Sequence, residues 1–236
     1  MENLKHYLRI ISKEVKESFI DNKYIILAIT LLFLITTILG FFFAADLQNF
    51  MKPVVKTFEH RISSGQVTLT THSLYYNNLL VTLRIYEGSF LMGVAGILEI
   101  IINALLIGHY GALCYMQGKL ILYILLILPH GIFEIPALII SSSGGFVMLE
   151  FLILFLKNLI SPDYSYTDVF DPIYNSDKIS FIETVKMSWR KNGKMFKQSL
   201  ILLLVAIILL MIAAFIEANI TQPLALLIYK YFIGIL

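Results

Sequence analysis

The sequence predicts an all-α, polytopic helical membrane protein, and three observations lead to this fold class. Hydrophobic residues make up 58% and charged residues 14% of the 236 positions, too few charges to cover a soluble domain of this size. The mean hydropathy is +0.80. The apolar residues also gather in runs of membrane length. We therefore expect about five to six transmembrane or half-membrane helices in a single membrane domain, 24–236.

Residues 1–23 are predicted to form a cytoplasmic amphipathic helix. Leu4, Leu8 and Ile11 begin an apolar stripe at steps of three and four, and the basic residues lie off that stripe. The first span is expected at 24–45, which has no charge until Asp46. At about 1.5 Å per residue this run crosses a hydrocarbon core of about 30 Å.

An external loop with one surface helix is predicted for 46–86, because Leu47, Met51 and Val54 share one helical face. The second span is expected at 88–116. Its glycines and alanines are small residues that let membrane helices approach closely.

The run after Leu120 is apolar but too long for one crossing, and it contains Pro129 and Pro136. We expect a proline-broken hairpin of two short helices, 120–140 and 145–157, that turns near the sequence SSSGG at 141–145. Broken helices of this kind must be protected by protein or line a wet cavity.

The segment 157–197 is polar and is predicted to be cytoplasmic. It ends in an interfacial helix with a basic face that is a candidate for docking lipid or a partner, although solvated anchoring is its simplest role. The residues of this face are Lys186, Arg190, Lys191, Lys194 and Lys197. A span at 198–219 follows, and 223–236 is expected to be a half-span or a docked tail.

Lysine and arginine counts set the expected orientation. The N-terminal arm has five and the 157–197 segment has seven, against Lys52, Lys56, Arg61 and Arg84 on the other side. The positive-inside rule then predicts a multi-pass protein of the cell membrane with a cytoplasmic N-terminus.

Polar residues within the apolar runs predict a buried cluster. A charge at mid-bilayer costs at least about 2.5 to 3.5 kcal/mol, so Glu99, Glu134 and Glu150 need a partner, a proton or water. Helical spacing places Glu99 and Asn103 on one face of the second span, and His130, Glu134 and Ser141 on one face of the next. The expected cluster forms if these two faces meet. Its members are Glu99, Asn103, His130, Gly131, Glu134 and Ser141.

His130 and Glu134 are spaced to share one side of a helix, which suits either a metal or proton-transfer site or a hydrogen-bonded clamp. The clamp is favoured because one histidine and one glutamate are only half of a zinc site, and His109 is a possible third ligand. We expect no cofactor and no metal. The single cysteine, Cys114, excludes an intrachain disulfide. No GxSxG or GxxxxGK[ST] motif supports serine hydrolysis or ATP hydrolysis.

The stretch LPHGIFEIPALIISSSGG, Leu128 to Gly145, resembles the signature of the stage II sporulation protein M family. The region from Tyr75 to Gly108 resembles the family's upstream part, with Asn77, Asn78 and Gly88 as its matching residues. The resemblance implies a small polytopic scaffold. In sporulating bacteria such proteins sit with two extracytoplasmic cell-wall-degrading proteins.

The expected function is therefore a non-enzymatic membrane scaffold. Its expected partners are the lipid bilayer and membrane or extracytoplasmic proteins; nucleic acid is not expected, and self-association stays open. One alternative is a transporter or channel that uses the intramembrane carboxylates and broken helices. A second alternative is an intramembrane metalloenzyme that uses His130 and Glu134.

Overall fold

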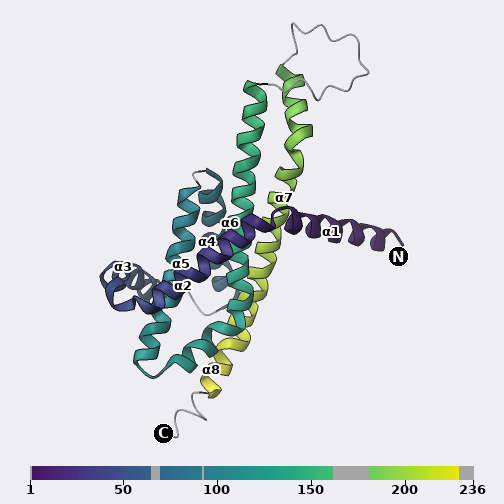
Figure 1. Cartoon of the computed structure of the whole chain (residues 1–236). Helices are drawn as coiled ribbons and strands as arrows, with labels where there is room; N and C mark the ends of the chain where they lie inside the picture. Colours follow the sequence, from purple (N-terminus) through teal and green to yellow (C-terminus); the bar gives the residue numbers. More distant parts are fainter. Residues whose placement is uncertain (1, 65–69, 92, 162–180, 229–236) are drawn as a thin grey trace, which may run out of the picture.

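The computed structural model describes residues 2–64, 70–91, 93–161 and 181–228, and these residues fold into helices without a strand (Figure 1). The all-α prediction is confirmed. In chain order the elements are α1 (Glu2–Asp21), α2 (Lys23–Phe42), α3 (Ala44–Ser63), α4 (Thr71–Leu91), α5 (Val94–Met116), α6 (Leu120–Ile160), α7 (Phe181–Ile216), the π-helix η2 (Glu217–Thr221) and α8 (Gln222–Ile228).

Four of the described helices are long and apolar enough to cross a membrane: α2, α5, α6, and α7 continued through η2. Each is at least 20 residues long, which at about 1.5 Å per residue matches the hydrocarbon core. The predicted class of helical membrane protein is thereby confirmed. Residues 229–236, within the expected C-terminal half-span, lie outside the described part.

The helix predicted within 46–86 is present as α3, but the prediction of a loop after it is wrong, because α4 begins at Thr71 and runs to Leu91. α4 is a member of the bundle and packs against α5, α6 and α7. Its buried residues include the polar Thr82 and Ser89 as well as Ile85. Asn77, Asn78, Arg84 and Glu87 lower the hydropathy of α4, so a search for apolar runs overlooks this helix.

The predicted hairpin is also wrong, because α6 is one continuous helix of 41 residues with Pro129 and Pro136 inside it. Figure 1 shows α6 bending in its early part and then running straight. Prolines remove backbone hydrogen bonds and bend a helix without ending it when neighbouring helices hold both halves. The expected turn at 141–145 lies inside α6, and every residue of it is buried.

These five residues form the contact surface between α6 and its neighbours, which we call the small-residue seam (Ser141–Gly145). Ser141 Oγ donates to the Thr82 carbonyl of α4 at 2.9 Å, and the Ser142 and Ser89 hydroxyls are 3.1 Å apart. On the other side, Ser199 Oγ of α7 donates to the Gly144 carbonyl at 2.7 Å. The seam therefore joins α4, α6 and α7 by hydrogen bonds that need close backbones.

The glycine-rich α5 packs closely against α2, as its composition predicts. A Cβ on Gly40 of α2 would lie 2.7 Å from the Leu105 carbonyl oxygen, and one on Gly108 of α5 would lie 2.8 Å from the Phe41 nitrogen. No side chain larger than hydrogen fits at either position. Small residues therefore set the distance between these two helices.

The end of α6 and the start of α7 continue together beyond the level of α1, and we call this pair the stalk (α6 from Glu150 and α7 to Phe196) (Figure 1). An aromatic cluster holds the two helices together, and Ser188 Oγ donates to the Phe155 carbonyl at 3.0 Å. The cluster consists of Phe151, Phe155, Trp189 and Phe196, with neighbouring ring centroids 5.3 to 5.9 Å apart. Such pairs contribute about 0.5–1.5 kcal/mol each beyond their area.

Replacing Gly145 by alanine is expected to destabilise the bundle by about 1–3 kcal/mol, the usual cost of overpacking a core. The new methyl group would meet the Tyr86 carbonyl oxygen and the Ser89 Cβ, neither of which can rotate away. Thermal unfolding in detergent micelles measures the loss. Gly131→Ala is the matched control in the same helix, since a Cβ there would lie 3.2 Å from a side-chain methyl group of Ile127 and would meet no backbone atom of another helix. Equal losses for both variants contradict a rigid seam.

Candidate functional site

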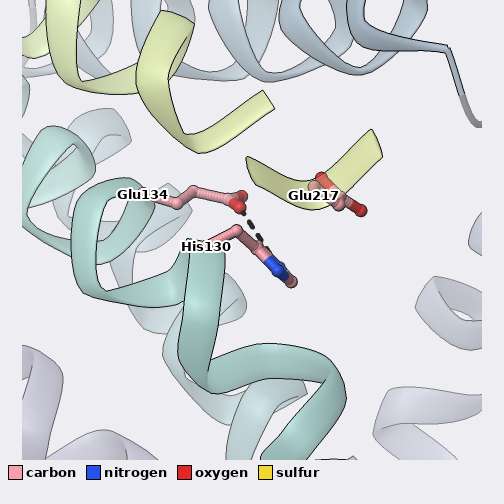
Figure 2. Close-up of side chains that lie close together, drawn as sticks. All are labelled: His130, Glu134 and Glu217. Carbon is pink, nitrogen blue, oxygen red and sulfur yellow. Dashed lines mark ion pairs between the residues drawn. The ribbon is translucent and has the colours of Figure 1, made fainter. Parts of the chain in front are cut away.

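Three ionisable side chains meet where the early part of α6 faces the end of α7 (Figure 2). His130 and Glu134 come from α6, one turn apart, and Glu217 is the first residue of η2. His130 Nε2 lies 3.8 Å from Glu134 Oε2. One ligand atom from each of the three residues lies within 4.8 Å of the other two. We call this group the His–Glu–Glu site.

The π-helix explains how α7 contributes to this site. A π-helix inserts a residue into a helical turn and changes which side chains face a neighbour, and such segments are frequent at functional sites. Here Glu217 joins the site, and Thr221 at the other end of η2 is buried. Thr221 Oγ1 lies 3.4 Å from His130 Nδ1, a weak hydrogen bond that orients the ring.

The site is half-buried and lies at one end of the bundle. The side chains of His130 and Glu134 keep 13% and 26% of their exposure. Lys197 and Glu217 delimit the apolar part of α7, which at about 1.5 Å per residue is about as long as the hydrocarbon core is thick. The His–Glu–Glu site therefore lies at the end of this apolar stretch opposite to Lys197.

The structure distributes the residues of the predicted polar cluster over three places. His130 and Glu134 lie together, and Gly131 is buried beside them. Ser141 belongs to the small-residue seam. On α5, the Asn103 side chain donates to the Glu99 carbonyl at 2.8 Å. Among the described residues, no hydrogen bond or ion pair joins Glu99 or Asn103 to the His–Glu–Glu site.

Sequence reasoning missed Glu217. It lies in the stretch EANIT directly after the apolar run of α7, where a carboxylate is expected to mark the polar end of a span. Its place in the site depends on the π-helical turn, which the sequence does not reveal. His109, considered as a further ligand, is buried in α5 and does not belong to the site.

Comparison with known proteins decides the family. The family model described as stage II sporulation protein M matches residues 29–222. The chain belongs to the stage II sporulation protein M family. Uncharacterized protein MJ0706 of Methanocaldococcus jannaschii is 26% identical over 92% of this chain and 91% of its own length. Uncharacterized protein MJ0793 of the same organism is 30% identical over 79% of this chain and 90% of its own length. No solved structure matches.

The family match covers both parts of the His–Glu–Glu site and the small-residue seam. Its upstream residues lie on α4, where Asn77 donates to the Asn78 side chain at 3.2 Å. Gly88 is at the crossing of α4 and α5, since a Cβ there would lie 2.8 Å from the Gly96 nitrogen. The match begins inside α2, so α1 lies outside it.

The basic face predicted on α7 is exposed, and two of its residues contact α1. Lys194 Nζ lies 2.8 Å from Asp21 Oδ2, and Lys197 Nζ lies 2.6 Å from Glu14 Oε1. The Gln198 side chain also donates to Asp21 at 2.7 Å. These contacts, which we call the α1 clamp, hold the second half of α1 against α7, and the first half of α1 extends away from the bundle (Figure 1). Lys186, Arg190 and Lys191 are exposed further along the stalk.

The α1 clamp has a defined dependence on acid. Hydrogen bonds from Lys194 and Gln198 hold the pKa of Asp21 below its ordinary value of 3.8. Because the pKa of Asp21 is lower in the folded state, the clamp stabilises the fold when the pH is above the unfolded-state pKa of Asp21. This contribution is lost as the pH falls through the folded-state pKa.

We expect Asp21→Asn to free α1 at neutral pH. A nitroxide on Ser12→Cys, in a Cys114→Ala background, should report a more mobile α1 by electron paramagnetic resonance. The parent protein should keep the immobile signal down to about pH 4 and lose it in stronger acid, where Asp21 takes up a proton. Asp46→Asn, at an exposed carboxylate of α3, is the matched control. An unchanged signal in Asp21→Asn would show that other contacts hold α1.

Proposed function

We propose that this protein is a non-enzymatic membrane scaffold that holds partner proteins at the cell membrane. The observation that carries the proposal is the small-residue seam, which fills the centre of the bundle with paired polar groups. The hydroxyl groups of Ser141, Ser142 and Ser199 form hydrogen bonds with neighbouring helices. Paired polar groups between close backbones hold helices together, whereas a transport path needs polar groups that face water.

The stalk supplies a surface for a partner. Beyond α1 it exposes large apolar side chains beside the basic residues Lys186, Arg190 and Lys191. The exposed apolar residues include Leu156, Ile160, Phe181, Ile182 and Trp189. Since the stalk continues past the level at which α1 lies, a protein with an apolar and acidic face suits this surface better than a lipid headgroup.

A second surface, at the base of the stalk, suits a helix of a membrane partner. α2 and α6 enclose an apolar groove of about 430 Å³. Its lining includes the apolar residues Ile25, Ile29 and Phe146 and the carboxylate of Glu150. An exposed apolar groove of this kind accepts a side-chain ridge from another membrane helix, and a carboxylate beside it favours a basic or hydrogen-bonding residue.

The proposed orientation places the stalk and α1 in the cytoplasm. The Tyr86 and Ser199 hydroxyls are 2.7 Å apart, so Arg84 lies near the level of α1. Arg84 therefore lies on the proposed cytoplasmic side. Lys119, directly before α6, lies on the opposite side because α6 is a single helix whose other end forms the stalk. The excess of basic residues remains on the side of α1, as the positive-inside rule requires.

The alternative function is a transporter or channel, and the His–Glu–Glu site favours it. Carboxylates within membrane helices mark ion and proton paths in many transporters, and the π-helix breaks regular helix geometry there. Ion flux into proteoliposomes that disappears in Glu217→Gln would support this alternative over a scaffold.

The scaffold proposal predicts a specific contact on the stalk. A photo-crosslinking amino acid at Ile182 in native membranes should give a discrete adduct with one protein, because this exposed position lies on the proposed docking surface. Leu204, equally exposed but within the apolar part of α7, is the matched control and should give only lipid products. Absence of a protein adduct at Ile182 and at further stalk positions, such as Trp189, would contradict the proposal.

A further inference from the structure

We propose that the His–Glu–Glu site binds one divalent transition-metal cation and so links α6 to the end of α7. The site offers one imidazole nitrogen and two carboxylates from two elements that are 83 to 87 residues apart in sequence. Three protein ligands with an open fourth position form a common zinc arrangement. This cation site goes beyond the scaffold proposal and does not depend on it.

The charges favour a cation. Glu134 and Glu217 bring two carboxylates together in a half-buried place, where like charges repel strongly. Among the described residues, the ion-pair partner of Glu134 is His130, and neither carboxylate has a lysine or arginine partner. A divalent cation between the carboxylates removes this repulsion.

The surroundings of His130 prepare it to bind through one nitrogen. Its Nδ1 faces Thr221 Oγ1 at 3.4 Å, so this nitrogen can donate its proton there. Nε2, which faces Glu134, then presents its lone pair to the site. Metal-binding histidines are typically oriented in this way by a hydrogen bond from the other ring nitrogen.

The ligand types identify the class of cation. Imidazole is a poor ligand for Mg²⁺ and Ca²⁺, and two carboxylates without a thiolate are a poor site for Cu⁺. Zn²⁺, Mn²⁺ and Fe²⁺ accept both ligand types. With bonds of about 2.0–2.2 Å, ligand atoms of a tetrahedral site lie roughly 3.5 Å apart. The present separations, up to 4.8 Å, need only rotation of the glutamate side chains to contract.

Metal analysis of the full chain in detergent tests the proposal. Protein stripped with chelator, reloaded with ZnCl₂ or MnCl₂ and freed of excess metal should retain one equivalent of metal. Glu217→Gln and His130→Ala should each reduce retention to background. Glu150→Gln, at an exposed carboxylate of the same helix, is the matched control and should retain the full equivalent.

Two further readouts keep the result decisive if a variant folds poorly. Addition of the metal should raise the Tm of the parent protein, and Co²⁺ should give the intense visible absorption of a tetrahedral site. No retained metal and no Tm shift in the parent would overturn the proposal. Full retention by a folded Glu217→Gln variant would also overturn it, because the metal would then bind elsewhere.

Discussion

The close contact of α6 with α4 and α7 at the small-residue seam is the interaction on which the rest of the structure depends. Lipid tails are as apolar as a leucine side chain, so burying apolar surface between membrane helices provides little free energy for their association. Close packing and hydrogen bonds between helices must supply the stability. Ser141 to Gly145 supply both, because these residues are small enough for the Thr82 carbonyl of α4 and the Ser199 hydroxyl of α7 to come within hydrogen-bonding reach of α6.

The seam holds α7 in the position from which its two ends contribute to the α1 clamp and to the His–Glu–Glu site. Towards the N-terminus of α7, the residues next to Ser199 form the α1 clamp, and the stalk extends beyond it. Towards its C-terminus, η2 presents Glu217 to the bent part of α6, where His130 and Glu134 lie. One well-packed centre thus joins two chemically different surfaces at opposite ends of the bundle.

The sequence predicted the helical membrane class, because the length and composition of long apolar runs are set by the bilayer itself. It failed where tertiary contacts override a local pattern. SSSGG is typical of a turn, yet in α6 each of these residues is buried against another helix. α4 is too polar to be recognised as a bundle helix, and Glu217 becomes part of the site only through a π-helical turn. His130 and Glu134 were found because helical spacing alone places them together.

The most direct test of the central claim is a disulfide across the seam. The Ser89 and Ser142 hydroxyls are 3.1 Å apart, so cysteines at these positions, in a Cys114→Ala background, are placed to form a disulfide between α4 and α6. We predict rapid, nearly complete oxidation in the membrane with retention of the folded state. The pair at Ser89 and Ser143 should stay reduced, because Ser143 donates to the Ile139 carbonyl of its own helix. Equal oxidation of both pairs, or of neither, would contradict a packed seam at the centre of the bundle.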